Sequence, residues 1–338
     1  MVLVTGGTGL VGAHLLYKLL QEGQSVRAIF RTQISLQKTK NLFKTCNAQH
    51  LFQQIEWIEA DILDIPALEN AFQNIEMVYH AAALISFDPK DEEKLRKTNI
   101  EGTANIVNCS IAFGVKKLCY FSSIAAMGDA LQKNQEINET TEWNPEKPHS
   151  DYAISKHGAE MEVWRGFQEG LETIILNPGV IIGAGFWESG SGLLFKHAEK
   201  GLPYFTNGST GYIDVEDVAQ IAIKLMQSKI KGEQYCLVAE NCTFKNILGL
   251  LAESLGKKPP HKPLQPWFIG ILWRLDWVRA TLFGTYRMLS KPMAKSLFSN
   301  DNFSNQKIVN TRNYQFISIK SSILKTGKAY QNAMAEKP

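Results

Sequence analysis

Glycines recur at every third position near the start of the chain, at positions 6, 9 and 12. They lie between a short apolar run at 2–4, typical of a buried strand, and a stretch at 10–21 with helical periodicity. Glycines in this setting allow a tight turn, close approach of backbone to a pyrophosphate, and tight packing of helix on sheet. The helix N-terminus adds free N–H groups that favour phosphate.

The spacing of this turn is GxxGxxG rather than the simplest dinucleotide fingerprint, GxGxxG. The alternative is a glycine-rich loop that serves only to reverse the chain. The preceding strand, the following helix and the position near the start of the chain favour dinucleotide binding. The residues expected to contact the cofactor here are Gly6, Thr8, Gly9, Leu10, Val11 and Gly12.

Strand and helix patterns alternate through the first half of the chain, which predicts an α/β fold with a doubly wound parallel Rossmann sheet. The expected strands lie at 2–4, 26–30, 56–59, 77–81, 117–122 and 172–177, with helices at 10–21, 67–72, 92–113 and 152–168. After Pro178 this rhythm changes, and from Cys242 the pattern is mostly helical. We therefore predict a dinucleotide-binding domain at 1–176 plus about 213–238. A smaller, mainly helical substrate-binding part is expected at 177–212 and 239–338.

Composition limits the classes of function. The net charge of +3 gives no concentrated basic face for nucleic acid. The histidines are scattered without metal-ligand spacing, so no metal is expected. Five cysteines without paired spacing, and no room for a signal peptide before the first strand, favour free thiols and a cytoplasmic location.

The end of the second strand indicates which dinucleotide is bound. An NAD site usually carries Asp or Glu there, accepting from the ribose 2′-OH. This chain has no acid at that position but has Arg31, whose planar guanidinium pairs with a 2′-phosphate. NADP(H) is therefore favoured. NAD(H) stays open, because the alternative is that Arg31 is a solvated charge at a strand end.

Two further segments fit the adenine side of a cofactor. Asp61 and Ile62 follow the third strand, where Asp61 would receive the adenine amino group. Ala81, Ala82 and Ala83 follow the fourth strand and offer small side chains where the cofactor passes close to backbone. The alternative for Asp61 is a helix cap.

A tyrosine and a lysine four residues apart, Tyr152 and Lys156, share one face of a predicted helix. A nearby ammonium favours the phenolate, which would lower the phenol pKa from about 10 toward a catalytic range. Ser123 ends a predicted strand at the edge of the sheet where ligands bind, and its hydroxyl suits an oxygen that gains charge. The alternative is that Tyr152 and Lys156 are two surface residues of a helix with no shared function.

The chain also resembles a known family. The matching segments, in order, are TGGTGLVG at 5–12, DI at 61–62, HAAA at 80–83, NIEGT at 99–103, FSS at 121–123, YAISK at 152–156, NPGVIIG at 177–183 and YIDVEDVA at 212–219. They resemble the extended short-chain dehydrogenases/reductases of the NAD-dependent epimerase/dehydratase superfamily. The resemblance implies Ser123, Tyr152 and Lys156 as the active triad, with Lys156 also at the nicotinamide ribose.

The same resemblance implies several supporting residues. Asn99 would support the active site, and the alternative is an ordinary helix-interior asparagine. Asn177, Pro178 and Gly179 would lie at the cofactor. Asn177-Pro178, in place of the Arg-Pro of sugar-nucleotide epimerases, looks more like dihydroflavonol reductases and 3β-hydroxysteroid dehydrogenases. A homodimer is common in such a family.

The segment 263–289 is dense in Trp, Phe, Leu and Ile, interrupted by Arg274, Asp276, Arg279 and Arg287. It is interpreted either as a lid helix packed on the core or as a segment that lines an apolar pocket or touches a membrane surface. The second interpretation predicts a hydrophobic small-molecule substrate.

Three functions follow from these patterns. The first is an NADP(H)-dependent oxidoreductase that interconverts a secondary alcohol and a ketone, with Tyr152 as proton donor and acceptor. The second is a nucleotide-sugar epimerase or dehydratase that retains NAD. The third is a non-catalytic dinucleotide-binding sensor, which has no need of the proton-transfer groups.

Overall fold

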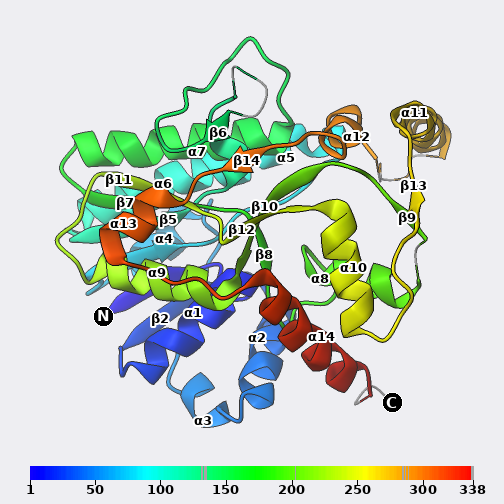
Figure 1. Cartoon of the computed structure of the whole chain (residues 1–338). Helices are drawn as coiled ribbons and strands as arrows, with labels where there is room; N and C mark the ends of the chain where they lie inside the picture. Colours follow the sequence, from blue (N-terminus) through cyan, green and yellow to red (C-terminus); the bar gives the residue numbers. More distant parts are fainter. Residues whose placement is uncertain are drawn as a thin grey trace.

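A seven-stranded parallel sheet forms the centre of the computed structural model, which describes residues 1–335 except 131, 133, 134, 202, 284, 286 and 288 (Figure 1). The predicted doubly wound Rossmann fold is confirmed. The chain order reverses between β1 and β4, and their carboxyl ends therefore flank the crevice where ligands bind in such sheets. The strands, in spatial order, are β11 (Glu233–Leu237), β7 (Glu172–Pro178), β5 (Lys117–Phe121), β4 (Met77–His80), β1 (Val2–Thr5), β2 (Val26–Phe30) and β3 (Glu56–Glu59).

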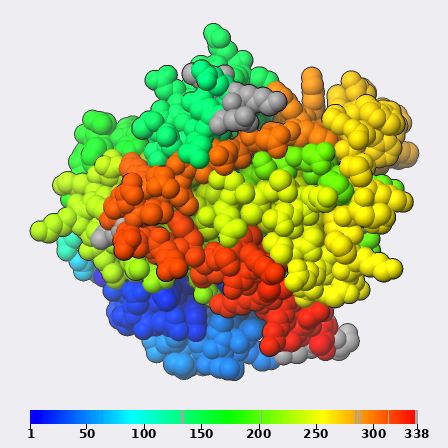
Figure 2. Space-filling model, in the orientation of Figure 1, coloured from blue at the N-terminus to red at the C-terminus, as the bar shows by residue number. Residues whose placement is uncertain are grey.

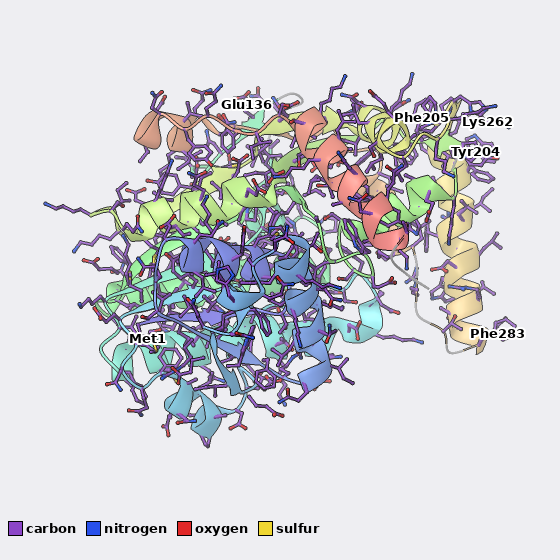
Figure 3. All side chains as sticks on the ribbon, turned by 90° about the horizontal axis from the view of Figure 1, so that it is seen from below. Met1, Glu136, Tyr204, Phe205, Lys262 and Phe283 are labelled. Atoms are coloured by element: carbon purple, nitrogen blue, oxygen red, sulfur yellow. The ribbon has the colours of Figure 1, made fainter. Side chains whose placement is uncertain are left out.

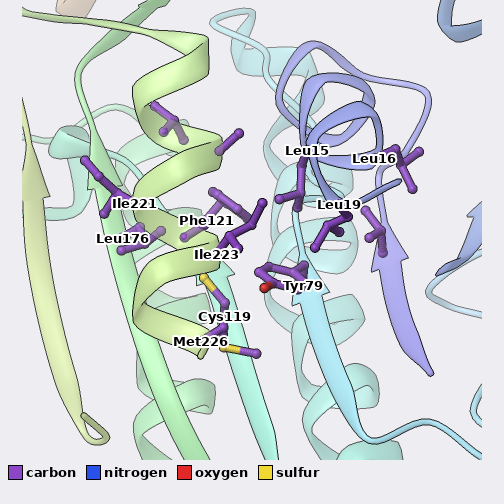
Figure 4. Packing of buried hydrophobic residues seen from close by; sticks show 14 of the residues in the cluster. Leu15, Leu16, Leu19, Tyr79, Cys119, Phe121, Leu176, Ile221, Ile223 and Met226 are labelled. Carbon is purple, nitrogen blue, oxygen red and sulfur yellow. The ribbon is translucent and has the colours of Figure 1, made fainter. Parts of the chain in front are cut away.

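Helices cover both faces of this sheet. Because side chains alternate along a strand, Val2 and Val4 pack under α1 (Leu10–Gln21) and α9 (Val215–Met226), whereas Leu3 faces the other side. That other side is covered by α4 (Ile65–Ala71), α6 (Gly102–Ala112) and α7 (Asp151–Gln168). Figure 4 shows Leu15 and Leu19 of α1 and Ile223 and Met226 of α9 converging around Tyr79.

A separate apolar core holds the smaller lobe, where α8 (Gly192–Glu199), α10 (Phe244–Ser254) and α14 (Ile319–Ala335) surround a three-stranded sheet. Its strands, in spatial order, are β12 (Glu240–Thr243), β10 (Ser209–Asp214) and β8 (Val180–Ile182). Trp187, Phe195 and Tyr330 pack as a cluster of rings in this core.

The predicted helix at 92–113 is not one continuous α-helix. It comprises α5 (Glu92–Leu95), a π-helical segment (Arg96–Glu101) and α6. A π segment widens the turn, and such segments are frequent at functional sites. Here it contains Asn99, whose side chain bonds to two other segments of the active-site region. After β2 come α2 (Gln33–Thr45) and α3 (Gln49–Phe52), with Asn47 in the left-handed region between them.

Short strands and two helices line one edge of the molecule. β13 (Lys262–Pro263) pairs with β9 (Tyr204–Phe205), and α11 (Pro266–Phe283) and α12 (Lys291–Ser296) follow along this edge (Figure 3). The remaining elements are η1 (Pro89–Asp91), η3 (Ile124–Ala126), β6 (Glu136–Ile137), β14 (Asn302–Phe303), which pairs with β6, and α13 (Gln306–Arg312). Among the described residues, no helix is both long enough and apolar enough to cross a membrane.

Candidate active site

The glycine turn between β1 and α1 brings backbone segments into close contact. A Cβ on Gly6 would lie 2.6 Å from the backbone of Ala81 and Ala82, and Gly6 has a positive φ of 70°. A Cβ on Gly12 would lie 2.2 Å from the Gly6 carbonyl oxygen. Gly9 is the N-cap residue of α1, and within the described chain no side-chain hydrogen bond caps this end of the helix. The turn thus presents uncapped N–H groups in a cradle that a Cβ would fill, which fits the pyrophosphate of a dinucleotide.

The predicted adenine-side residues follow successive strands. Arg31 directly follows β2, and one of its guanidinium nitrogens lies 4.0 Å from Asp61 Oδ2. Asp61 Oδ1 accepts a hydrogen bond from the Leu63 N–H. The Arg31 side chain is exposed and that of Asp61 is partly exposed, so a ligand that carries its own charge can displace their contact. The Ile62 side chain, in contrast, is buried in the core, where it packs against Gly102.

A chain of hydrogen bonds connects the end of β1 to the start of α6. Thr5 Oγ1 lies 2.7 Å from His80 Nδ1, and His80 Nε2 lies 3.0 Å from Thr103 Oγ1. Thr5 Oγ1 also accepts from the Ala82 N–H at 3.1 Å. Burial, with a smaller contribution from Lys156, lowers the pKa of His80 to about 3. A neutral His80 therefore connects the ends of β1 and β4. Ala81, Ala82 and Ala83 follow directly after β4.

Ser123, Tyr152 and Lys156 lie together at the end of β5 and the start of α7. Ser123 accepts from the Ala125 N–H, and Ser150 caps α7 by accepting from the Ala153 N–H. Lys156 is buried, and its Nζ donates to the Phe121 carbonyl at 2.7 Å and lies 4.3 Å from the Tyr120 ring centroid. The fold therefore brings these three predicted residues together, although their catalytic roles stay predictions.

The electrostatics of this triad differ in part from expectation. Burial raises the pKa of Tyr152, and a hydrogen-bonding interaction with the Ser123 side chain partly offsets that rise. Burial lowers the pKa of Lys156 to about 7, although the nearby Glu160 carboxyl acts in the opposite direction and raises it. The lysine thus titrates near neutrality. The group that moves the phenol toward ionisation is the serine hydroxyl.

Asn99 connects α7 to the loop after β4. Its Oδ1 accepts from the Leu84 N–H at 2.7 Å, and its Nδ2 donates to the Leu84 carbonyl at 3.0 Å and to Ser155 Oγ at 2.9 Å. Ser155 Oγ in turn donates to the Tyr152 carbonyl at 2.8 Å. These bonds connect Asn99 to the first turn of α7, where Tyr152 lies, and its role as a support for the active site stays a prediction.

A buried carboxyl group behind Ser123 was missed by sequence reasoning. Glu160 Oε1 accepts from Asn177 Nδ2 at 2.6 Å, and Oε2 accepts from Gln234 at 3.3 Å. The same Asn177 amide donates to the Ser123 carbonyl at 2.8 Å. Burial raises the pKa of Glu160 to about 7. The signal available was spacing, because Glu160 lies four residues after Lys156 on one face of α7.

The Asn177-Pro178-Gly179 segment ends β7. The Asn177 side chain is committed to the buried network around Glu160, which leaves the backbone of this segment as its route to a cofactor. Gly179 donates to the Leu237 carbonyl, and a Cβ on Gly179 would lie 2.4 Å from the Gly211 carbonyl oxygen. A cofactor-binding role for these three residues stays a prediction.

Two cavities are lined by residues other than Ser123, Tyr152 and Lys156. One of about 430 Å³ lies between α1, α9 and residues 313–317 and contains none of the predicted site residues. Another of about 90 Å³ borders Glu160, His157 and Trp143. Neither contains the Tyr152 hydroxyl, so the triad, not cavity size, locates the candidate active site. Among the described residues there is no cluster of three potential metal ligands, and the expectation of no metal stays a prediction.

A cradle for a dinucleotide beside a Ser–Tyr–Lys group defines a class: NAD(P)-dependent oxidoreductases of the short-chain dehydrogenase/reductase type. Residues 2–237 match the family described as "NAD dependent epimerase/dehydratase family". The chain belongs to this family and is an NAD(P)-dependent oxidoreductase acting on CH–OH or carbonyl groups. The predicted family resemblance is thus confirmed.

Two curated relatives are similar over most of their length. One is named "Putative dihydroflavonol 4-reductase", from Synechocystis sp., 31% identical over 78% of this chain and 75% of that protein. The other is sterol demethylase protein B from Methylococcus capsulatus, 29% identical over 78% and 77%.

Two solved structures share the fold at lower identity. Yeast methylglyoxal/isovaleraldehyde reductase Gre2, complexed with NADPH, has a TM-score of 0.76 at 21% identity, covering 99% of each chain. The UDP-glucose 4-epimerase of Thermotoga maritima, with UDP-glucose, has a TM-score of 0.77 at 21% identity, covering 98% and 99%.

Proposed function

We propose that this enzyme uses NADP(H) to interconvert a secondary alcohol and a ketone on a hydrophobic small molecule. The observation that carries the proposal is the convergence of Ser123, Tyr152 and Lys156 at the sheet edge that also bears the glycine cradle. The reductase names of the relatives, and the NADPH in the Gre2 structure, support the same direction.

The proton chemistry follows from the three side chains. Ser123 donates a hydrogen bond to the substrate oxygen and so favours the charge that gathers there. Tyr152 gives its phenolic proton to that oxygen during reduction and takes it back during oxidation. The Ser123 side chain favours the phenolate that results, and Lys156 in its protonated form would favour it further, because a nearby cation lowers the cost of that charge. A bound nicotinamide supplies or receives the hydride at the carbon.

The preference for NADP(H) rests on Arg31. It directly follows β2, where an NAD enzyme usually carries an acid, and its side chain is 68% exposed. A 2′-phosphate would offer this guanidinium a dianionic partner in place of Asp61.

A nucleotide-sugar epimerase is the second candidate, favoured by the epimerase neighbours. The non-catalytic sensor is disfavoured, because it would not need the three proton-transfer groups. A homodimer, a cytoplasmic location and the division into domains stay predictions.

Absorbance at the nicotinamide band separates the two enzymatic functions. Purified protein is given NADPH with hydrophobic ketones, or UDP-sugars without added cofactor. The proposal expects stoichiometric NADPH consumption with a ketone. Tightly retained NAD⁺ together with an epimerised sugar nucleotide would establish the alternative instead.

A further inference from the structure

One face of α11 is apolar and points away from the protein. Trp267, Ile271, Leu275, Val278 and Leu282 follow each other at spacings of four, four, three and four, which places them on one face of the helix. All five are exposed, Trp267 at 67% and Leu282 at 71%. We call these five residues the outer stripe.

The opposite face of α11 is the one that packs on the protein. Ile269 and Ala280 are the buried residues of this helix, and the Asp276 side chain on the same face is only 12% exposed. A surface helix of a globular protein normally turns its apolar side chains inward and its polar ones outward. α11 is apolar on both faces, which marks the outer stripe as a contact surface for something else.

The views agree that this helix is peripheral. α11 lies at the edge of the molecule beside α12 in Figure 1, and it forms a protruding edge of the space-filling surface in Figure 2. In Figure 3 it runs along the outside of the molecule from near Lys262 to Phe283.

The charges around α11 indicate an anionic partner. Between positions 257 and 295 the sequence has one acid, Asp276, which is paired with Arg279. The same stretch has eight basic residues: Lys257, Lys258, Lys262, Arg274, Arg279, Arg287, Lys291 and Lys295. An apolar stripe flanked by cations is the pattern of a helix that lies in a lipid headgroup layer. No described helix could cross the bilayer, so α11 would lie along its surface.

The segment after α11 is bonded to the active-site loop. The Arg287 N–H donates to Asp88 Oδ2 at 2.7 Å, and the Leu289 N–H donates to Asp276 Oδ2 at 3.0 Å. Asp88 is buried and follows Phe87, whose ring lies 5.7 Å from the Tyr152 ring, centroid to centroid. The segment that follows α11 is therefore linked to the Tyr152 ring through Asp88 and its neighbour Phe87.

We propose that α11 docks the enzyme on an anionic membrane surface through the outer stripe, and that the substrate is a membrane-resident alcohol or ketone that reaches Tyr152 past Phe87. The proposal of docking rests on the properties of α11 alone. The identity of the substrate class rests on the proposed function.

Flotation of the full chain with lipid vesicles tests the docking without any reaction. Vesicles of phosphatidylcholine with phosphatidylserine should carry the protein, and those of phosphatidylcholine alone should carry much less. The double variant Leu275→Glu/Leu282→Glu should reduce binding at least about tenfold, because it places two acids in the stripe. The matched control is Ile34→Glu on α2, an apolar side chain that is 86% exposed elsewhere and should leave binding unchanged.

Three results would overturn the docking. Wild type could fail to float with anionic vesicles, or the double variant could float equally well. The third is a wild-type dimer that the double variant dissociates, without vesicle binding, which would make the stripe an interface between copies. Oxidation of NADPH with a water-soluble ketone is measured in parallel and should be equal in both proteins. Loss of that reaction in wild type would refute the proposed function and leave the vesicle result standing.

Discussion

Asn177 Nδ2 donates a 2.6 Å hydrogen bond to Glu160 Oε1 and also holds the carbonyl of Ser123 at 2.8 Å. One buried amide thus couples Ser123 to a buried carboxyl group. Burial raises the pKa of that carboxyl to about 7, while burial lowers the pKa of Lys156, one turn earlier on α7, to about 7. The pKa values of a lysine and a glutamate differ widely in water, but on this helix both lie near 7.

Glu160 should make stability fall as pH rises. In the folded chain its pKa is about 7 against 4.5 in an unperturbed glutamate, so between these values the unfolded chain loses the proton that the folded chain keeps. Glu160→Gln should remove this fall, and the variant should gain on wild type in free energy of unfolding between pH 5 and pH 8. Denaturant titrations at several pH values measure it.

The control for this prediction is Glu169→Gln, which removes an exposed carboxylate paired with Arg165 outside the buried network. Lys156 works in the opposite sense, since its lowered pKa makes stability rise with pH between about 7 and 10.5. Parallel pH profiles for wild type and Glu160→Gln would contradict the assignment of the carboxyl.

Arg31→Asp should move the cofactor preference from NADPH toward NADH. The aspartate would repel a 2′-phosphate and accept a hydrogen bond from a ribose 2′-OH, whereas the arginine attracts a 2′-phosphate. The ratio of the two dissociation constants, measured by fluorescence titration, should change by at least about tenfold. Lys231→Asp, which replaces a surface cation paired with Glu172, is the control and should leave the ratio unchanged. An unchanged ratio in Arg31→Asp refutes the role of Arg31.

Gly12→Ala should both weaken cofactor binding and destabilise the fold. The new Cβ would lie 2.2 Å from the Gly6 carbonyl oxygen, so backbone must move, at a cost of about 1–3 kcal/mol. Gly249→Ala is the matched control, because a Cβ there meets nothing within 4 Å on α10. It should stabilise the chain by about 0.5–1 kcal/mol. Thermal unfolding and NADPH titration check both, and equal effects of the two substitutions would contradict the cradle.

Features that repeat along the chain could be predicted from sequence. The strands predicted at 2–4 and 117–122 are observed as the buried strands Val2–Thr5 and Lys117–Phe121, because a parallel sheet covered on both faces excludes water from every position. The glycine turn, Tyr152 and Lys156 stand in continuous local patterns, so their placement needed no knowledge of distant segments.

Features made by distant segments could not be predicted. The contacts of Glu160 with Asn177 and Gln234 depend on strands 17 and 74 positions away along the chain. Burial of Tyr152, which raises rather than lowers its pKa, is a property of the whole fold. The direction of the outer stripe on α11 also escapes a pattern analysis, because this helix is apolar on both faces.

Tyr152→Phe tests the central claim most directly, by comparing turnover with cofactor affinity. The variant keeps the ring that lies against Phe87 and loses only the hydroxyl. NADPH should bind with an unchanged dissociation constant, while ketone reduction should fall about 10²–10⁴-fold, the contribution of a positioned proton donor. Tyr204→Phe, at an exposed tyrosine on β9, should match wild type in both. Comparable reduction rates in Tyr152→Phe and wild type would contradict the account.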